Sequence, residues 1–223
     1  MIQHDIMKKY HSSNERKKYK SSKEQFYTKE NVIQQCIGYG TQYLTSDLKS
    51  CMDFSAGNNI FIKNIKTQCL HIESFFAYDI DPKNELVIKQ DFLQLEPFDV
   101  DVVGFNPPFG WQSCTARDFL FHASKFHPKF MLVILPFCQK YIYPPFYKEI
   151  FSMKLSENSF YSPVKCKDVI VKNCRFVILH HDLSFIYEAP EKEKEIIFAN
   201  MKRPSRRNDG SWWPEFINGC GFA

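Results

Sequence analysis

The chain has 223 residues, of which 44% are hydrophobic and 16% aromatic, and its formal net charge is +4. This length and composition suit one globular domain with a hydrophobic core and exclude an intrinsically disordered chain. The longest apolar run, residues 130–138, is too short to cross a bilayer, so no membrane contact is expected. The eight cysteines show no C-x-x-C spacing and no secretory signal is recognised, so we expect reduced thiols in an intracellular protein, in cytoplasm or nucleus.

Two clusters of basic residues stand out against the mild net charge. Residues 8–23 contain seven lysines and arginines against one glutamate, and the second cluster is KRPSRR, residues 202–207. Such runs are often only solvated surface, but they also suit contacts with a polyanion. The clusters leave both interpretations open.

Short apolar runs alternate with helix-like segments along the middle of the chain. Apolar residues at helical spacing predict a first helix after Thr28, whose hydroxyl is placed to cap it. The next segments are expected as a strand at 50–54, a helix at 58–68, strands at 74–79, 85–91 and 100–105, a helix at 116–126, a strand at 130–136, a short helix at 143–151, and an antiparallel hairpin of 154–163 with 174–182.

Continuous apolar strands separated by helices are typical of a parallel sheet covered on both faces. We therefore predict an α/β fold whose doubly wound, mostly parallel seven-stranded sheet is closed by an antiparallel hairpin. Three regions are expected: a basic N-terminal segment at 1–24, the α/β domain at 25–189, and a C-terminal extension at 190–223.

One group of metal-ligating residue types occurs late in the chain. Cys174, His180, His181 and Asp182 lie close together in the sequence. They fit the end of a strand and the following turn better than a metal site, so no metal ion is predicted.

Polar and small residues follow the predicted strands at their carboxyl ends, where doubly wound sheets bind ligands. The loop DFSAGNN follows the first strand, and its Gly57 permits close approach of a ligand, while asparagines tolerate left-handed backbone. Asp79 ends the second strand, where an acid can accept hydrogen bonds from ribose hydroxyls. After the third strand, Asp91 suits an adenine amino group and Phe92 suits the ring face. An ordinary turn fits this last pair nearly as well.

The fourth strand ends in Asn106, Pro107, Pro108 and Phe109. Each proline fixes its own φ and keeps the preceding residue out of the helical region, so the segment is extended and stiff. The turn then offers two fixed acceptors, the Asn106 side-chain oxygen and the Pro107 carbonyl, beside the ring of Phe109. Two acceptors and a stacking ring suit a planar group that carries an NH2. A rigid turn without a ligand is the alternative.

An amino group of this kind is a poor nucleophile because its lone pair is delocalised. Hydrogen bonds accepted from the NH2 shift electron density onto nitrogen and orient the lone pair. Orientation and preorganised dipoles then supply the catalysis without a strong base. The motif therefore predicts group transfer to a planar amino group.

Taken together, the motifs resemble those of S-adenosylmethionine (SAM)-dependent amino-methyltransferases with an Asn-Pro-Pro-aromatic motif, especially the adenine-N6 enzymes. The resemblance covers residues 25–136, about half of the chain. It implies a Rossmann-like methyltransferase fold and SAM as cofactor. It implies SAM-binding roles for Phe26, Tyr27, Thr28, Asp53, Ser55, Gly57, Asp79, Asp91, Phe92 and Asn106, and catalytic roles for Asn106, Pro107, Pro108 and Phe109. Asn59 departs from the family pattern, which has glycine there.

The resemblance implies methyl transfer to the N6 amino group of adenine in nucleic acid, with RNA slightly favoured over DNA. The basic clusters would contact phosphates, and a second stacking ring would come from Trp111, Phe160 or Tyr161. Little of the chain remains for reading a target sequence, so a protein partner for target recognition is also expected. The alternatives are protein-glutamine N5 methylation, N4-cytosine or guanine-N2 methylation, and a non-catalytic subunit that keeps the fold.

Overall fold

The computed structural model describes residues 26–109, 114–136, 143–163, 165–185, 204–206 and 212–214. The helices are α2 (Glu30–Gly40), α3 (Ile60–Gln68) and α4 (Cys114–Ala123), with short 3-10 turns η1 (Thr41–Tyr43), η2 (Phe92–Gln94) and η4 (Ser124–Phe126). The strands are β1 (Tyr27–Thr28), β2 (Ser50–Asp53), β3 (Ser74–Asp79), β4 (Ile88–Lys89), β5 (Val102–Phe105), β6 (Phe130–Pro136), β7 (Tyr147–Lys154), β8 (Phe160–Ser162), β9 (Lys167–Val169), β10 (Cys174–His181), β11 (Pro204–Arg206) and β12 (Trp212–Pro214).

Seven strands form the main sheet in the order β4-β3-β2-β5-β6-β10-β7. The first five run parallel, and β10 lies antiparallel between β6 and β7. The predicted α/β fold with a mostly parallel seven-stranded sheet and an antiparallel edge is therefore confirmed. The strand order reverses between β2 and β5, which is where a doubly wound sheet opens a cleft at its carboxyl edge.

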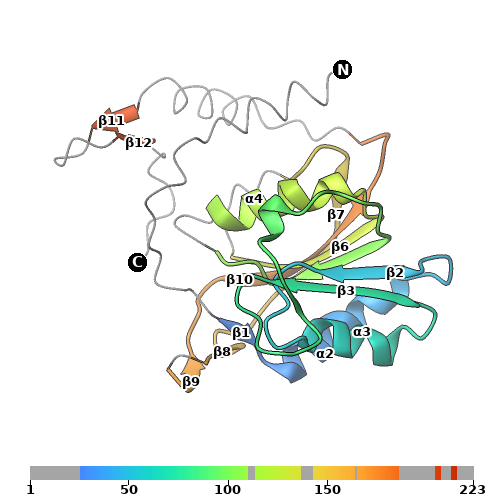
Figure 1. Ribbon diagram of the computed structural model, residues 1–223, viewed down its shortest axis with the longest axis horizontal. Helices are drawn as coiled ribbons and strands as arrows, with labels where there is room; N and C mark the ends of the chain where they lie inside the picture. Colours follow the sequence, from blue (N-terminus) through green and yellow to red (C-terminus); the bar gives the residue numbers. More distant parts are fainter. Residues whose placement is uncertain are drawn as a thin grey trace.

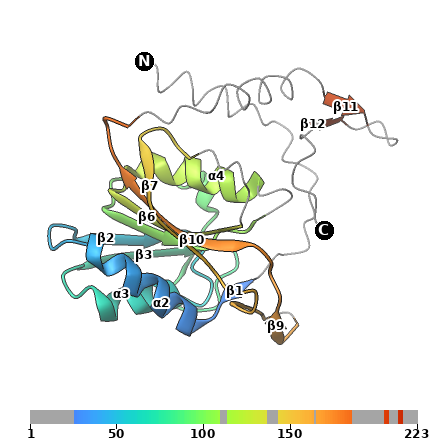
Figure 2. The same ribbon diagram turned by 180° about the vertical axis from the view of Figure 1, so that it is seen from behind.

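Helices cover both faces of this sheet, with α2 and α3 together on one face and α4 on the other (Figures 1 and 2). Successive strand residues point to opposite faces, so each parallel strand contributes to two cores. Cys51 and Val102 belong to the cluster packed by α2 and α3. Their neighbours Met52 and Val103 belong to the cluster on the α4 face. Burial on both faces explains why these strands read as continuous apolar runs.

One prediction about the later part of the chain was wrong, and another was right only in part. Residues 147–151 belong to strand β7 rather than to a helix, and β7 is the antiparallel neighbour of β10 on the side away from β6. Of the segment 154–163, only the first residues pair with β10: Lys154 lies opposite Arg175, and the Leu155 N–H donates to the Cys174 carbonyl at 2.8 Å. Its strand β8 instead joins β1 and β9 in a separate three-stranded sheet.

Two further details differ from the sequence-based expectations. The third parallel strand, β4, is only two residues long. Thr28 does not cap α2, because the N-cap residue is Lys29 and it makes no side-chain capping bond. The Thr28 hydroxyl is used elsewhere, as described below. The predicted segment 1–24 lies outside the described residues, and of the region 190–223 only the hairpin β11–β12 is described.

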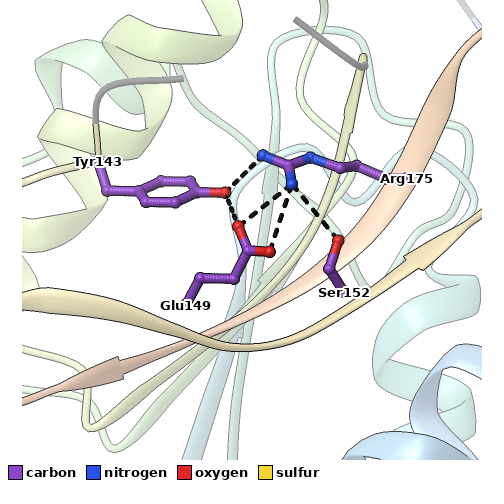
Figure 3. Close-up of polar contacts among 4 residues, drawn as sticks. All are labelled: Tyr143, Glu149, Ser152 and Arg175. Atoms are coloured by element: carbon purple, nitrogen blue, oxygen red, sulfur yellow. Dashed lines mark hydrogen bonds and ion pairs between the residues drawn. The ribbon is translucent and has the colours of Figure 1, made fainter. Parts of the chain in front are cut away.

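A hydrogen-bonded ion pair fixes the antiparallel edge of the sheet (Figure 3). Arg175 Nη1 lies 3.3 and 3.2 Å from the two carboxylate oxygens of Glu149 and 3.4 Å from Ser152 Oγ. Arg175 Nη2 donates to the Tyr143 hydroxyl at 2.6 Å, and that hydroxyl donates to Glu149. The Arg175 side chain is only 14% exposed, and Glu149 places a counter-charge beside it.

Glu149→Gln is expected to lower the free energy of unfolding by about 1–3 kcal/mol, because it removes a negative charge that lies beside a nearly buried guanidinium. Urea denaturation measures this change. The control is Glu73→Gln, which breaks an ion pair with Lys49 whose two side chains are 72% and 54% exposed. Equal losses in the two variants would contradict a special role for the Arg175 pair.

No helix within the described ranges is long and apolar enough to cross a membrane.

Candidate active site

A cavity of about 730 Å³ lies at the carboxyl edge of the sheet. It is bounded by segment 26–28, by the loops that follow β2, β3, β4 and β5, and by the first turns of α4. All thirteen site residues predicted from the sequence line it: Phe26, Tyr27, Thr28, Asp53, Ser55, Gly57, Asp79, Asp91, Phe92, Asn106, Pro107, Pro108 and Phe109. A volume of this size fits a small-molecule cofactor.

Asp53 lies at the floor of the cavity, at the end of β2. The residue is only 3% exposed, and its carboxyl accepts a 2.9 Å hydrogen bond from the Ser55 N–H. Burial raises the pKa of this carboxyl well above its usual range, and the Asp79 charge adds to the effect, while the Ser55 bond acts in the opposite direction. Protonation of this carboxyl is therefore easier in the folded protein than in water.

The loop after β2 is tied to the end of β3 by Asp79. Asp79 Oδ2 accepts from the Gly57 N–H at 2.8 Å, and Asp79 Oδ1 accepts from the Asp81 N–H at 2.7 Å. Each carboxylate oxygen keeps a further lone pair for a ligand hydroxyl. Asn59, at φ 66°, adopts the left-handed conformation that was expected to be tolerated in this loop.

Tyr27 covers this loop from segment 26–28. Gly57 has φ +50°, and a Cβ added there would lie 3.2 Å from the Tyr27 ring. Burial raises the pKa of Tyr27 to about 12, and the charges of Asp79 and Asp81 contribute to the shift. Tyr27 is therefore a neutral phenol that packs against the backbone of the loop.

Gly57→Ala is expected to weaken cofactor binding by roughly ten-fold or more, because a side chain both strains the positive φ and displaces Tyr27. Isothermal titration calorimetry with SAM measures the change. Gly38→Ala in α2 is the matched control, since its added Cβ meets only ordinary contact at 3.6 Å from Gln68. This control should bind SAM normally and gain about 0.5–1 kcal/mol in stability.

The cavity wall after β4 is only partly as predicted. Asp91 Oδ1 accepts from the Leu93 N–H at 3.0 Å and Asp91 Oδ2 from Gln94 Nε2 at 3.0 Å, so its carboxylate is held at the wall. Phe92 does not offer a free ring face, because it is 2% exposed and stacks on Phe54 with ring centroids 3.7 Å apart. Its predicted role against an adenine ring is corrected to core packing, and Leu93 is the apolar lining residue beside it.

The turn after β5 fixes the orientation of the Asn106 amide. Asn106 Nδ2 donates to the Phe26 carbonyl at 2.9 Å and to Thr28 Oγ1 at 3.2 Å. A backbone carbonyl only accepts, so the NH2 must face segment 26–28. Asn106 Oδ1 is buried and has no hydrogen-bond partner among the described residues. A buried acceptor of this kind calls for a donor.

Phe109 lines the cavity beside this acceptor and is supported from behind. Its ring meets Phe160 edge-on, with centroids 6.3 Å apart and planes at 84°. Phe160 is fully buried, so it supports Phe109 and offers no second stacking face. Tyr161, the next residue of strand β8, is 36% exposed, and Trp111 lies outside the described residues.

Some lining residues were not predicted from the sequence. Thr115 and Phe119 come from the first turns of α4, and Ile60 and Ile80 follow the loops after β2 and β3. Thr115 and Phe119 are four residues apart, so they lie on one face of α4, the first helix after the Asn106 turn. This helical spacing in the sequence could have identified them as residues that line the cavity.

The metal-ligating residue types of β10 do not form a site. Cys174 and His180 pair with opposite ends of β6, at Pro136 and Phe130 respectively. Within the described parts of the chain no group of three or more His, Cys, Asp and Glu residues could hold a metal ion. Cys36, Cys51, Cys69, Cys166 and Cys174 are free thiols.

Comparison with known proteins identifies the family of this fold and cavity. A family model described as the EDM2 methyltransferase-like domain matches residues 44–180. The chain belongs to this family. The EDM2 methyltransferase-like match thus includes the loops after β2, β3, β4 and β5, whereas segment 26–28 precedes it.

Individual relatives agree with the family match. The protein ENHANCED DOWNY MILDEW 2 of Arabidopsis thaliana is 29% identical over 122 residues, which are 49% of this chain and 9% of that protein. The chain thus spans about a tenth of this relative.

Solved structures are also similar to this EDM2-like domain. A candidate RNA methyltransferase from Pyrococcus horikoshii aligns at 16% identity with a TM-score of 0.51, covering 72% of this chain and 88% of its own. A magnesium protoporphyrin IX methyltransferase from Synechocystis, solved with bound SAM, aligns at 9% identity with a TM-score of 0.49, covering 69% and 79%. The Pyrococcus structure agrees with the methyltransferase-like fold of the domain.

Proposed function

We propose that this EDM2-like domain is a SAM-dependent methyltransferase that acts on the N6 amino group of adenine in nucleic acid. The observation that carries the proposal is the Asn106 amide: the residue lines the cavity, its NH2 is bound to segment 26–28, and its buried oxygen has no partner among the described residues. Such an acceptor, fixed beside a proline-rich turn and an aromatic ring, suits an incoming planar amino group.

The cofactor end of the cavity fits SAM by its chemistry. Asp79 and Asp91 present held carboxylates to hydroxyl and amino groups, and Gly57 lines the cavity at a place where an added Cβ would meet the Tyr27 ring. Burial raises the pKa of Asp53, and a cation bound beside it would favour the carboxylate form. SAM, when bound, would supply an electrophilic methyl group.

The chain's own residues bind and orient the amino group. Asn106 Oδ1 accepts one hydrogen of the NH2, and the Pro107 carbonyl is the expected second acceptor. Phe109 stacks on the attached ring. This arrangement lowers the entropic barrier and directs the nitrogen lone pair without requiring a general base in the first step.

The favoured target is an unpaired adenine, and RNA is the first pool to test, because a base in a single strand or loop enters the cavity without being flipped from a duplex. A glutamine side-chain amide presents a similar NH2 to the same two acceptors, which makes protein the second pool. The basic clusters 8–23 and 202–207, which lie largely outside the described residues, favour nucleic acid. A protein partner that supplies target recognition remains part of the proposal.

The test is transfer of an isotope-labelled methyl group from SAM to separate RNA, DNA and protein pools, with mass spectrometry of the modified product. The expected product is N6-methyladenosine, absent when Asn106→Ala replaces the wild-type chain. Detection of methylglutamine or N4-methylcytosine would instead assign protein glutamine or cytosine as the substrate. An absence of both transfer and SAM binding would support a non-catalytic subunit.

A further inference from the structure

A hydroxyl on the cofactor loop contacts the catalytic turn directly. Ser55 Oγ donates a 2.8 Å hydrogen bond to the main-chain carbonyl of Asn106. The two residues are 51 positions apart in sequence, on the loops that follow β2 and β5. The contact is partly buried at the wall of the cavity. The hydroxyl therefore points to the turn that carries the proposed catalytic acceptors.

The carbonyl that Ser55 holds determines the direction of the whole turn. Three rotatable backbone torsions lie between the Asn106 and Pro108 α-carbons and govern where the Pro107 carbonyl points: ψ of Asn106, φ of Pro107 and ψ of Pro107. The Pro107 ring fixes its own φ, and each proline restricts the ψ of the residue before it to the extended region. Within that region, a hydrogen bond to the Asn106 carbonyl sets ψ of Asn106.

We propose that Ser55 is a positioning residue that fixes ψ of Asn106, and that its hydroxyl serves the catalytic turn instead of the cofactor. The inference rests on the proposed function, because it assigns Ser55 to the geometry of amino-group binding. Ser55 also donates its N–H to Asp53, so one residue joins the buried acid to the turn.

The same turn is held from the opposite side by segment 26–28. The Phe26 carbonyl and Thr28 Oγ1 accept from the Asn106 side chain, while Ser55 donates to its main chain. Tyr27, between them, packs on Gly57 of the cofactor loop. The acceptors for the amino group are thus positioned by the two segments that also enclose the cofactor end of the cavity. Cofactor binding should therefore tighten the turn.

Carbonyl NMR tests the hydrogen bond without any activity. The chain has a single Asn-Pro bond, Asn106–Pro107. Labelling asparagine with 13C at the carbonyl and proline with 15N therefore selects one resonance in the full chain. An accepted hydrogen bond moves a carbonyl carbon downfield, so Ser55→Ala should move this resonance upfield and Ser55→Thr should restore it. In the wild type, SAM should shift it further, and Ser55→Ala should reduce that response.

Ser50→Ala, on the strand β2 that precedes the Ser55 loop, is the matched control for a lost serine hydroxyl. Ser50 Oγ donates to Asp101 at 2.8 Å and does not line the cavity. This variant should lower the melting temperature while leaving the Asn106 carbonyl resonance and the turnover number unchanged.

Kinetics test the consequence for methyl transfer. Ser55→Ala should lower kcat by about 10- to 100-fold, because a misdirected turn misplaces the amino group. The Kd for SAM, measured by calorimetry, should stay unchanged, and Ser55→Thr should recover most of the lost turnover.

The inference is overturned if Ser55→Ala leaves the carbonyl resonance in place, or if SAM affinity falls in step with turnover, which would identify Ser55 as a cofactor ligand. A wild-type chain that methylates no pool would instead overturn the proposed function. In that case the resonance of Ser55→Ala, and its response to SAM, still decide whether Ser55 positions the turn.

Discussion

Asn106→Ala is expected to lower methyl transfer by roughly 100- to 1,000-fold, the loss typical of one preorganised polar group at a reacting centre. The substitution removes the buried acceptor Oδ1 and also the NH2 that binds the Phe26 carbonyl and Thr28 Oγ1. SAM affinity should fall much less, because Asp79, Asp91 and Gly57 lie on other loops. Single-turnover transfer and calorimetry measure the two effects separately.

Asn64→Ala is the matched control for the Asn106 substitution. Asn64 is a buried asparagine at 3% exposure, and its Nδ2 donates to the Ile60 carbonyl at 2.8 Å within α3. This control should lose stability and keep its turnover. Asn106→Asp adds a second comparison, because it keeps an acceptor but loses the donors that orient it, so it should also be impaired. Full activity in Asn106→Ala would refute the assignment of the amino-group acceptor.

Much of this site could be predicted from the sequence because parallel strands bring their carboxyl ends to one edge. Asp53 and Asp79 end strands, and Asp91 and Asn106 follow strands. A doubly wound sheet brings such positions together whatever the intervening helices contain. Proline adds a local constraint that needs no tertiary information, so the stiffness of the turn at 106–109 was also readable. All of these residues line one cavity.

The parts that could not be predicted depend on long-range pairing. Strand β8 reads as a hairpin partner for the nearby β10, but it pairs with β1, where Tyr27 lies opposite Tyr161. A two-residue strand such as β1 carries no periodic signal, so its partner is set by packing alone. The burial of Phe92 has a similar cause, since its ring is enclosed by Phe54 from a loop 38 positions earlier in the chain.

Hydrogen bonds between loops are the least visible feature in a sequence. Ser55 in DFSAGNN has the residue type of an ordinary loop serine, and the resemblance implied contact with the cofactor. Only the juxtaposition of the loops after β2 and β5 shows that its hydroxyl reaches the Asn106 carbonyl. Side-chain direction within a loop depends on its neighbours, which is why residue roles were less predictable than residue positions.

Asp53→Asn is expected to stabilise the protein at neutral and higher pH while weakening SAM binding by about 10- to 100-fold, the effect of losing one hydrogen bond to a charged group. Asp53 is buried, and its pKa is raised well above the usual range by burial and by Asp79. Asparagine keeps an Oδ1 that can accept the Ser55 N–H and carries no charge to desolvate. The melting temperature should rise by roughly 2–4 °C per kcal/mol gained.

The pH dependence gives this prediction a definite sign. A carboxyl whose folded pKa lies above its unfolded pKa contributes stability below the unfolded value and loses that contribution as the pH rises through the folded pKa. The difference in melting temperature between Asp53→Asn and wild type should therefore grow with pH. Asp101 provides the opposite control: burial raises the pKa of its carboxyl, but hydrogen bonds from Lys49 and Ser50 outweigh this, and its net pKa is lowered. Asp101→Asn should thus lose stability above the unfolded pKa.

SAM binding should follow the same ionisation of Asp53. The carboxylate is the form that pairs with a cationic ligand, so binding of SAM should release the Asp53 proton. SAM affinity in the wild type should therefore rise with pH. Calorimetry in buffers of different ionisation enthalpy should detect the released proton. Asp53→Asn should show neither the pH dependence nor the proton release, while Asp101→Asn should keep both. An Asp53→Asn chain that melts lower than wild type at high pH would show that the ionised carboxyl stabilises the fold. That result would contradict the proposal that burial of Asp53 costs stability so that its carboxylate can bind the cofactor.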